Sequence, residues 1–347
     1  MPVPESAVGI KALDREGLAT LVSDLGEKRF RVAQIERWLY GTGVDSFSEM
    51  TDLSAGLRAK LADRLALPSL RIVTKQESAD GTRKYLVALA DDTTVEVVGL
   101  PAADRLTVCF STQAGCAMGC TFCATGTAGL TRDLGAGEMV DQVILVAKDF
   151  GRRVSNAVAM GQGEPFANYA ATLGALRFLN NPDTLGIGSR HITVSTCGLL
   201  TGIRRFAEEP EQFTLAVSLH SAVQSTRDRL MPGVRGTSLP DLRIALISYA
   251  EKTGRRPSLE YALIAGVNDS AEELSALIRF ARGLLVHVNL IPVNPVKESG
   301  YGRATGERVS TFQRELHMSA IQASVRAERG TDIDAACGQL RQREADL

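Results

Sequence analysis

Three cysteines, Cys116, Cys120 and Cys123, lie within eight residues of sequence. Iron–sulfur clusters are normally held by four thiolates and structural zinc sites by four ligands, yet no fourth cysteine follows nearby. A [4Fe–4S] cluster bound by three thiolates keeps one iron free for a substrate or cofactor. The C-x3-C-x2-C spacing therefore predicts a cluster that takes part in chemistry. The alternatives are a zinc knuckle completed by a distant Cys or His, and three buried thiols without a metal.

A glycine-rich segment, Gly161-Gln-Gly-Glu-Pro165, is a second candidate site. It follows an expected strand, and glycines such as Gly163 let the backbone approach a ligand closely. The Glu164 carboxylate can accept hydrogen bonds from a cationic amine. The competing interpretation is a strand-to-helix turn that binds no ligand.

Polar residues also stand where later strands are expected to end. They are Ser195, Ser218, His220 and Asn294. Active sites of β/α barrels gather at the C-terminal ends of the strands, so these residues are candidates for lining one pocket. Each is equally compatible with a helix cap or a polar turn, and a single histidine is more often structural than a ligand. We interpret Cys197, near the first of these ends, as a small packing residue.

The bulk composition is that of an ordinary soluble globular protein. The 347 residues are 44% hydrophobic and 23% charged, with a formal net charge of −1. Such a balance gives no whole-chain electrostatic support for nucleic-acid binding, and the densest basic run, Lys28-Arg-Phe-Arg31, fits a solvated helix face better than an RNA contact. With no signal-peptide pattern and no apolar run of membrane-spanning length, we expect a cytoplasmic protein that does not enter the membrane.

The order of elements predicts an α/β fold with two smaller parts in front of it. Residues 1–68 show helical periodicity, with Trp38 as a core residue, and residues 69–104 alternate with period two around Ala79-Asp-Gly81, a turn signal. Residues 105–347 alternate strands with helices, which predicts a parallel sheet with crossover helices. A curved, incomplete (βα)6 barrel fits that part. The six strands are expected at 106–111, 154–160, 191–195, 213–219, 257–263 and 287–291.

Several of these motifs together resemble a known family. The cysteine spacing, with Phe122 before the last Cys, is similar to the signature of radical-SAM enzymes, in which the open iron binds S-adenosylmethionine. The Gly161–Pro165 motif resembles that superfamily's cofactor-binding element, although Gln162 replaces the usual Met or Gly. Together with 218–220, 289–295 and the C-terminal run 329–340, these motifs resemble the RlmN/Cfr family of RNA adenosine methylases over about residues 96–340.

The resemblance implies roles for residues that the pattern alone leaves unassigned. Cys337 would take a methyl group from one S-adenosylmethionine, and a second, cleaved at the cluster, would generate a radical on it that adds to adenine. Glu96 would accept the ring proton, and Cys109 would release Cys337 by forming a disulfide. Without the family, Glu96 would be a solvent-facing strand residue and Cys109 a buried one. The resemblance assigns cofactor contacts to Gly163, Glu164, Ser195, Ser218, Leu219, His220 and Asn294.

The resemblance also implies the substrate and partners. An RlmN-type enzyme methylates adenosine C2 in the peptidyl-transferase centre of 23S rRNA and in tRNA beside the anticodon, whereas Cfr-type enzymes methylate C8. The Gly163-Glu-Pro165 ending and Met118 favour C2. A monomer supplied with electrons by a flavodoxin or ferredoxin is expected. A radical-SAM enzyme of a small molecule or peptide, and a non-catalytic iron–sulfur or zinc protein that binds RNA, remain as other classes.

The position of Cys337 predicts how the tail must fold. The segment after the sixth strand has to return over the barrel mouth to bring Cys337 near Cys109, because a disulfide needs Cα atoms within ~7 Å. Gly330 and Gly338 permit sharp turns. Asp332 and Asp334 are expected to anchor the segment on backbone N–H groups.

Overall fold

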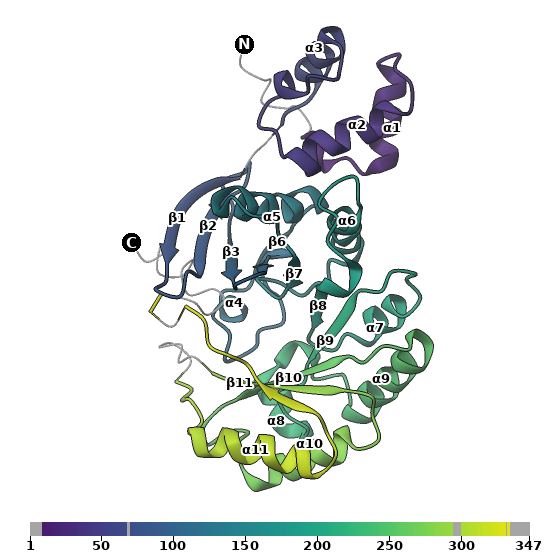
Figure 1. The fold of residues 1–347 in the computed structure, drawn as a ribbon. Helices are drawn as coiled ribbons and strands as arrows, with labels where there is room; N and C mark the ends of the chain where they lie inside the picture. Colours follow the sequence, from purple (N-terminus) through teal and green to yellow (C-terminus); the bar gives the residue numbers. More distant parts are fainter. Residues whose placement is uncertain (1–8, 68–69, 294–299, 331, 334–347) are drawn as a thin grey trace.

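In a computed structural model, which describes residues 9–67, 70–293, 300–330 and 332–333, the core is one curved sheet (Figure 1). Within the described residues it has ten strands in the order β1-β2-β3-β4-β7-β8-β9-β10-β11-β12. The crossover helices lie along the outside of the curve (Figure 1). This is the curved α/β sheet with crossover helices that the alternating pattern predicts.

The six predicted barrel strands are all present. They are β4 (Leu106–Cys109), β7 (Asn156–Ala159), β8 (Ile192–Thr196), β9 (Thr214–Ser218), β10 (Ser258–Leu263) and β11 (His287–Pro292). Neighbouring strands in this series pair in parallel. Their apolar side chains are buried because helices cover the outer face of the sheet and the residues of the candidate site cover its inner face.

Helices stand between the strands, as the alternation of elements predicts, although a second helix between β9 and β10, at Gln224–Leu230, was not predicted. They are α5 (Ala136–Phe150), α6 (Tyr169–Asn180), α7 (Leu200–Phe206), α8 (Gln224–Leu230), α9 (Leu239–Thr253), α10 (Ala271–Ala281) and α11 (Gly306–Met318), with 3-10 turns η4 (Ser189–His191) and η5 (Pro232–Val234). Ser238, Ser270 and Thr305 cap α9, α10 and α11, each accepting a backbone N–H of the first turn. These caps fix where each crossover begins.

A further parallel strand, β12 (Ala323–Val325), was not predicted. It pairs with β11, with Val288 opposite Ala323. Three residues are too few to show a periodicity, so no local pattern marks this strand. β12 carries the chain back to the mouth of the barrel.

The antiparallel strands extend the barrel sheet. They are β1 (Arg71–Glu77), β2 (Arg83–Ala88) and β3 (Thr94–Pro101). The predicted turn between β1 and β2 is present, with Gly81 at φ +80°. β3 pairs antiparallel with β4, with Val98 opposite Cys109. A separate hairpin, β5 (Gln113–Gly115) with β6 (Leu130–Asp133), forms a two-stranded sheet beside the barrel and also escaped prediction.

The N-terminal helical region packs on α5. It comprises η1 (Ile10–Ala12), α1 (Arg15–Asp24), α2 (Arg31–Glu36), a π-helical turn η2 (Arg37–Thr42), η3 (Phe47–Glu49) and α3 (Ala55–Arg64). Lys11 forms a 2.5 Å ion pair with Asp141 of α5. A Cβ on Gly137 would lie 2.4 Å from the Lys11 carbonyl oxygen, so the two elements touch directly. Trp38 packs against the hydrophobic core, as predicted.

The basic run at 28–31 is largely neutralised within its own region. Arg29 pairs with Glu16 at 3.0 Å and Arg31 with Glu27 at 3.5 Å. Both pairs agree with the prediction of a solvated face. In the part of the chain that the structure describes, no helix combines the length and apolar character needed to cross a bilayer.

Candidate active site

The three candidate cluster cysteines lie on one tightly wound loop, residues 116–123, which we call the cysteine loop. The Cys116 N–H donates to the Gly129 carbonyl at 2.8 Å, closing the loop at its base. A Cβ on Gly115, which has φ +85°, would lie 2.0 Å from that same oxygen. A Cβ on Gly126 would lie 2.8 Å from the Cys120 nitrogen. Glycine is therefore required at both positions, and it permits the tight winding of the loop.

The other side of the cysteine loop rests on the segment that follows α8. Thr121 N–H donates to the Leu230 carbonyl at 3.0 Å, and Gly233 N–H donates to the Met118 carbonyl at 2.9 Å. A Cβ on Gly233 would lie 2.7 Å from that oxygen. The loop is thus held against the barrel.

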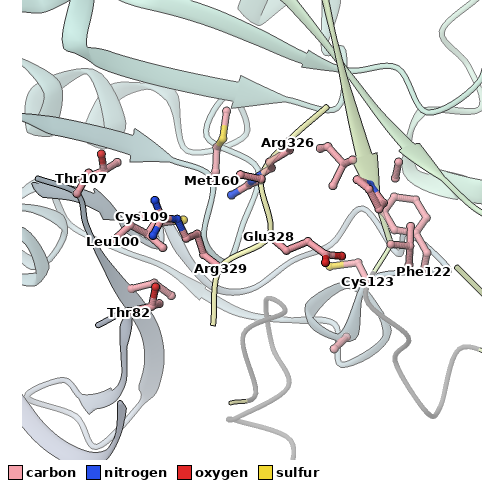
Figure 2. A pocket seen from close by; sticks show the side chains of 18 of the residues that line it. Thr82, Leu100, Thr107, Cys109, Phe122, Cys123, Met160, Arg326, Glu328 and Arg329 are labelled. Atoms are coloured by element: carbon pink, nitrogen blue, oxygen red, sulfur yellow. The ribbon is translucent and has the colours of Figure 1, made fainter. Parts of the chain in front are cut away.

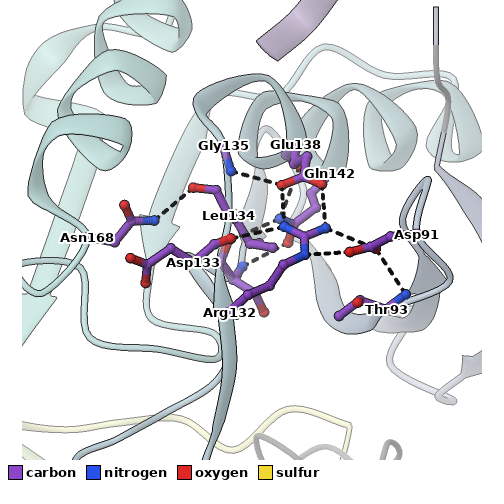
Figure 3. A network of polar contacts seen from close by, with 10 residues as sticks. Asp91, Thr93, Arg132, Asp133, Leu134, Gly135, Glu138, Gln142 and Asn168 are labelled. Carbon is purple, nitrogen blue, oxygen red and sulfur yellow. Dashed lines mark hydrogen bonds and ion pairs between the residues drawn. The ribbon is translucent and has the colours of Figure 1, made fainter. Parts of the chain in front are cut away.

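A polar network anchors the hairpin that carries the cysteine loop (Figure 3). Arg132 of β6 bonds to both oxygens of Asp91, in the β2–β3 turn, at 2.7 and 3.0 Å. It also bonds to both oxygens of Glu138 in α5, at 2.9 and 2.8 Å. Asn168 donates to the Thr112 and Leu134 carbonyls at 2.9 and 2.8 Å, so both ends of the hairpin are tied to the barrel. Paired bidentate contacts give geometric precision as well as energy.

The chemistry of the thiols fits a metal cluster. Burial raises the pKa of Cys116 to about 11 and that of Cys120 to about 12, and Cys123 nearby adds to both rises. Such thiols hold their protons near neutral pH, so a bound cationic centre has to displace them. Over the described residues, no three His, Cys, Asp or Glu side chains are grouped to hold a metal ion.

Two buried polar side chains in the candidate motifs also lack hydrogen-bond partners among the described residues. They are the amide of Gln162 and the hydroxyl of Thr125, two residues after Cys123. Buried polar groups are normally hydrogen-bonded. Unsatisfied groups here are consistent with a bound polar cofactor.

Glu164 is held at the end of β7 by backbone groups. Its two oxygens accept from Phe166 N–H at 3.0 Å and from Cys197 N–H at 2.7 Å, which links β7 to the end of β8. Burial raises its pKa, although these hydrogen bonds oppose the rise. Gly163 has φ +103°, and a Cβ there would lie 2.6 Å from Gln113. The motif is thus a rigid turn, and its contact with a ligand amine stays a prediction.

Arg227 was not predicted, yet its guanidinium joins the ends of two strands. It donates to the carbonyls of Ser218 at 3.2 Å, Leu219 at 3.1 Å and Cys197 at 2.7 Å. It is 1% exposed, and burial lowers its pKa. The thiols of Cys197 and Cys120 act in the opposite direction, so they lie close enough to interact with the charge. The sequence signal that could have indicated its burial is helical spacing, because Arg227 precedes the apolar residues Leu230 and Met231 by three and four positions.

His220 is a neutral, strained residue at the end of β9. Its φ is +53°, its Nδ1 accepts the Ala262 N–H at 3.0 Å, and its carbonyl accepts from Asn268 at 2.6 Å. Burial, helped by the charge of Arg227, lowers its pKa to about 3. The ring meets Phe122 edge-on, with centroids 4.8 Å apart. The histidine therefore supports the cysteine loop and presents an uncharged ring.

One cavity of about 490 Å³ joins the cysteine loop to the antiparallel strands. Figure 2 shows Cys123 and Phe122 on one side, Cys109 on the other, and Glu328 between them. Its volume is typical of a small-molecule site. His220 lines it, whereas the described residues Gly163, Glu164, Ser195, Ser218 and Leu219 do not. Ser195 and Ser218 are half-buried on neighbouring strands, and the Leu219 side chain is fully buried. Their cofactor contacts stay predictions.

Glu96 and Cys109 lie on adjoining strands, and Cys109 lines the cavity. Glu96 is buried on β3 and pairs with Lys84 at 3.1 Å, so it is not the solvent-facing residue that its strand position suggests. Burial raises the pKa of Cys109, while Arg326 and Lys84 oppose the rise. The two residues are therefore brought into one electrostatic environment.

The segment after β12 returns over the cavity, as predicted. Residues 326–329 line it together with Cys109. Asp332 accepts the Ala79 N–H at 2.9 Å and bonds to the Ser78 hydroxyl, and Gly330, at φ +62°, donates to Asp80 at 3.2 Å. The predicted anchoring by Asp332 is confirmed. Asn294, Asp334, Cys337 and Gly338 lie outside the described residues, so their predicted roles are not tested.

Comparisons with known proteins agree with this geometry. Residues 8–67 match the Ribosomal RNA large subunit methyltransferase N-terminal domain, and residues 110–281 match the Radical SAM superfamily. A probable dual-specificity RNA methyltransferase RlmN of Symbiobacterium thermophilum is 47% identical, covering 96% of this chain and 91% of that protein. Its counterpart in Bacillus subtilis is 45% identical over 338 residues, 96% of this chain and 93% of the relative.

The chain belongs to the RlmN family of radical-SAM RNA methyltransferases. A crystal structure of a radical SAM methyltransferase from Sphaerobacter thermophilus superposes with a TM-score of 0.90, at 45% identity over 96% of this chain and 98% of the other. RlmN-family membership implies S-adenosylmethionine and a [4Fe–4S] cluster as cofactors. The expected disulfide is not supported: Cys109, Cys116, Cys120, Cys123 and Cys197 are free thiols.

Proposed function

We propose that this RlmN-family enzyme methylates C2 of an adenosine in the peptidyl-transferase centre of 23S rRNA, and also an adenosine beside the tRNA anticodon. The observation that carries the proposal is the cavity that joins Cys123 to Cys109. Glu96 lies behind one wall, and the segment leading toward Cys337 crosses the opening. The relatives named as dual-specificity RNA methyltransferases support both RNA substrates.

The chemistry requires more than an ordinary methyl donor. C2 of adenine is electron-poor, so it does not attack the methyl group of S-adenosylmethionine. A second S-adenosylmethionine, bound at the cluster held by Cys116, Cys120 and Cys123, supplies the radical that the reaction needs. A one-electron donor such as a flavodoxin or ferredoxin starts each turnover.

The chain's own residues carry the methyl group and release the methylated RNA from the covalent adduct. Cys337 would accept a methyl group by a polar displacement, lose one hydrogen atom of that group to the radical, and add through the same carbon to the adenine. The ring radical left by this addition would return one electron to a one-electron acceptor such as the oxidised cluster. Glu96 then accepts the ring proton. The sulfur of Cys109 attacks the sulfur of Cys337, so an S–S bond forms as the S–CH2 bond breaks. The electron pair of that bond stays on the carbon, which takes up a proton to become the methyl group.

We assign residues 1–68 to RNA binding, residues 69–104 to the wall that bears Glu96, and residues 105–347 to the catalytic barrel. The match of residues 8–67 to the Ribosomal RNA large subunit methyltransferase N-terminal domain supports the first assignment. An adenosine in a loop also avoids much of the energy needed to unstack a paired base.

Mass spectrometry of rRNA and tRNA from a deletion strain tests the proposal. We expect loss of one 2-methyladenosine from each RNA, restored by the wild-type gene and not by Cys337→Ala. Cys109→Ala should accumulate RNA bound covalently to the protein, because release needs its thiol. Loss of 8-methyladenosine instead, or unchanged RNA, would refute the assignment of C2 and of these substrates.

A further inference from the structure

A buried ion pair stands behind the cavity wall formed by the antiparallel strands. The Nζ of Lys84 lies 3.1 Å from Oε2 of Glu96, and the two side chains are 0% and 4% exposed. Burying two charges is unfavourable unless each is paired well. An ion pair so fully enclosed, at the residue proposed to accept a proton, calls for a role in the reaction.

The strand register places this pair on the face of the sheet that looks into the cavity. Lys84 of β2 is opposite Val98 of β3, and Val98 is opposite Cys109 of β4. Because side chains directly opposite each other share a face, the three form one row. Val98 and Cys109 line the cavity. Glu96 stands two residues before Val98, on the same face of β3, and its side chain pairs with Lys84.

Charged side chains from three elements act on the Cys109 thiol. Lys84 and Arg326 both act to lower the pKa of Cys109, against its burial, and Glu96 acts to raise it. Arg326 comes from the segment that crosses the cavity, while Lys84 belongs to the fixed sheet. Lys84 is therefore the cation that stays beside Glu96 whatever occupies the cavity.

We propose that Lys84 is the positioning residue of the proton acceptor, keeping the Glu96 carboxylate ionised and fixed in orientation until the adenine ring is attached. The proposal rests on the proposed function. An isolated carboxylate in so dry a site would favour its neutral form, and a cation within ~4–6 Å favours the charged form. Only the charged form can take a proton from the ring.

The step balances once the ring radical has given one electron to a one-electron acceptor such as the oxidised cluster. The ring C–H bond breaks, its electron pair stays in the ring, and an O–H bond forms on Glu96. The ion pair then becomes an ammonium group beside a neutral carboxylic acid. No electron enters or leaves in this step, and the proton later returns to solvent.

The experiment compares variants of the cluster-loaded enzyme acting on an rRNA fragment, with three readouts. These are cleavage of S-adenosylmethionine, the amount of covalent protein–RNA adduct, and methylated product. Lys84→Met should leave cleavage within about twofold of wild type, accumulate adduct and lower product formation about 100-fold, the lower range for a positioned general base. Lys84→Arg, which keeps the cation, should restore most of the product.

Three further variants separate this role from a structural one. Lys75→Met removes the ion pair of Lys75 with Asp149, on the opposite face of the same strands, and should behave as wild type. Glu96→Gln should accumulate adduct, and adding Lys84→Met to it should change nothing more, because Lys84 acts through Glu96. The double variant buries no unpaired charge, so it tests the idea even where Lys84→Met alone fails to fold.

The outcomes are distinguishable from failure of the proposed function. If wild type forms no adduct and no methylated RNA, the proposed function is wrong. If wild type methylates but Lys84→Met matches Lys75→Met, or if Lys84→Met lowers adduct formation further in the Glu96→Gln background, Lys84 does not act through Glu96. Failure of Lys84→Arg to release product would equally overturn the role of the cation.

Discussion

At the scale of single residues, burial sets the protonation of the thiols and the histidine in the site. The thiols of Cys116 and Cys120 have raised pKa values because they are buried together. His220 is kept neutral by burial beside Arg227. A bound cationic centre would lower the pKa of the Cys116 and Cys120 thiols again, since metal ligation stabilises thiolates. The neutral histidine adds no positive charge that would compete with it.

Replacing any one of Cys116, Cys120 and Cys123 by Ala should abolish the brown colour of anaerobically purified protein. The reason is that we expect these three thiolates alone to hold the cluster, so the loss of any one leaves too few protein ligands. Iron content and the visible absorption spectrum are the measurements. Cys197→Ala is the matched control, because Cys197 is buried nearby but outside the cysteine loop, and its protein should keep its iron. A triple Ala variant with full iron and activity would end the cluster assignment.

At the scale of elements, the ends of the strands are joined by polar side chains. Glu164 ties β7 to β8 through the Cys197 N–H, and Arg227 ties β8 to β9 through three carbonyls. The β1–β2 turn in the same way holds the segment after β12. These contacts set the spacing of the strand ends, and with it the shape of the cavity.

Arg227→Met should destabilise the protein by about 3 kcal/mol or more, since several buried carbonyls would lose their donor. It should also weaken S-adenosylmethionine binding, because the ends of β8 and β9 would separate. Denaturant unfolding and equilibrium binding are the measurements. Arg229→Met removes an exposed cation two residues away and should leave both unchanged. Equal behaviour of the two variants would contradict the role given to Arg227.

Asp332→Ala should release the segment over the cavity from the β1–β2 turn. The Ser78 hydroxyl and then the Ala79 N–H hold the pKa of Asp332 below its ordinary value. A lowered carboxyl pKa favours the bound state above the ordinary pKa, and the effect is lost as pH falls through the lowered one. Faster trypsin cleavage after Arg329 and faster hydrogen exchange of the turn are expected at neutral pH. Asp104→Ala, an exposed carboxylate elsewhere, is the control, and unchanged cleavage in Asp332→Ala would refute the anchor.

At the scale of the whole molecule, the helical N-terminal region is fastened to the barrel through η1 and α5. The contact is direct at Gly137 and ionic at Lys11 and Asp141. Burial raises the pKa of Asp141 to about 6, and the charge of Lys11 only partly opposes it. The junction between the RNA-binding region that we propose and the catalytic barrel is therefore sensitive to pH.

Stability should fall as pH rises from about 4 to about 7 because of Asp141. Its folded pKa exceeds the unfolded value, so its contribution is fully present below the unfolded pKa and is lost as pH rises through about 6. Two pKa units correspond to at most about 3 kcal/mol. Denaturant unfolding of wild type and Asp141→Asn, both loaded with cluster, measures the difference. If the two proteins show the same pH dependence, the raised pKa is wrong.

The sequence by itself determined the chemistry and the order of the elements. The cysteine spacing and the Gly161–Pro165 motif are local, so their meaning survives without knowledge of the fold. The alternation of strands and helices is also local, because a period of two or 3.6 residues can be read within one segment. These signals predicted all six barrel strands, and the resemblance placed Glu96 and Cys109 at the site.

Only the tertiary structure decided which residues meet. Lys84 and Glu96 become partners through the register of β2 and β3, and Ser78 and Asp332 meet across 254 positions of sequence. Arg227 is buried and Arg229 exposed, although both stand in the same short helix. Such contacts depend on how a sheet curves and which face each strand presents. No local period encodes that geometry, because it arises when distant segments pack together.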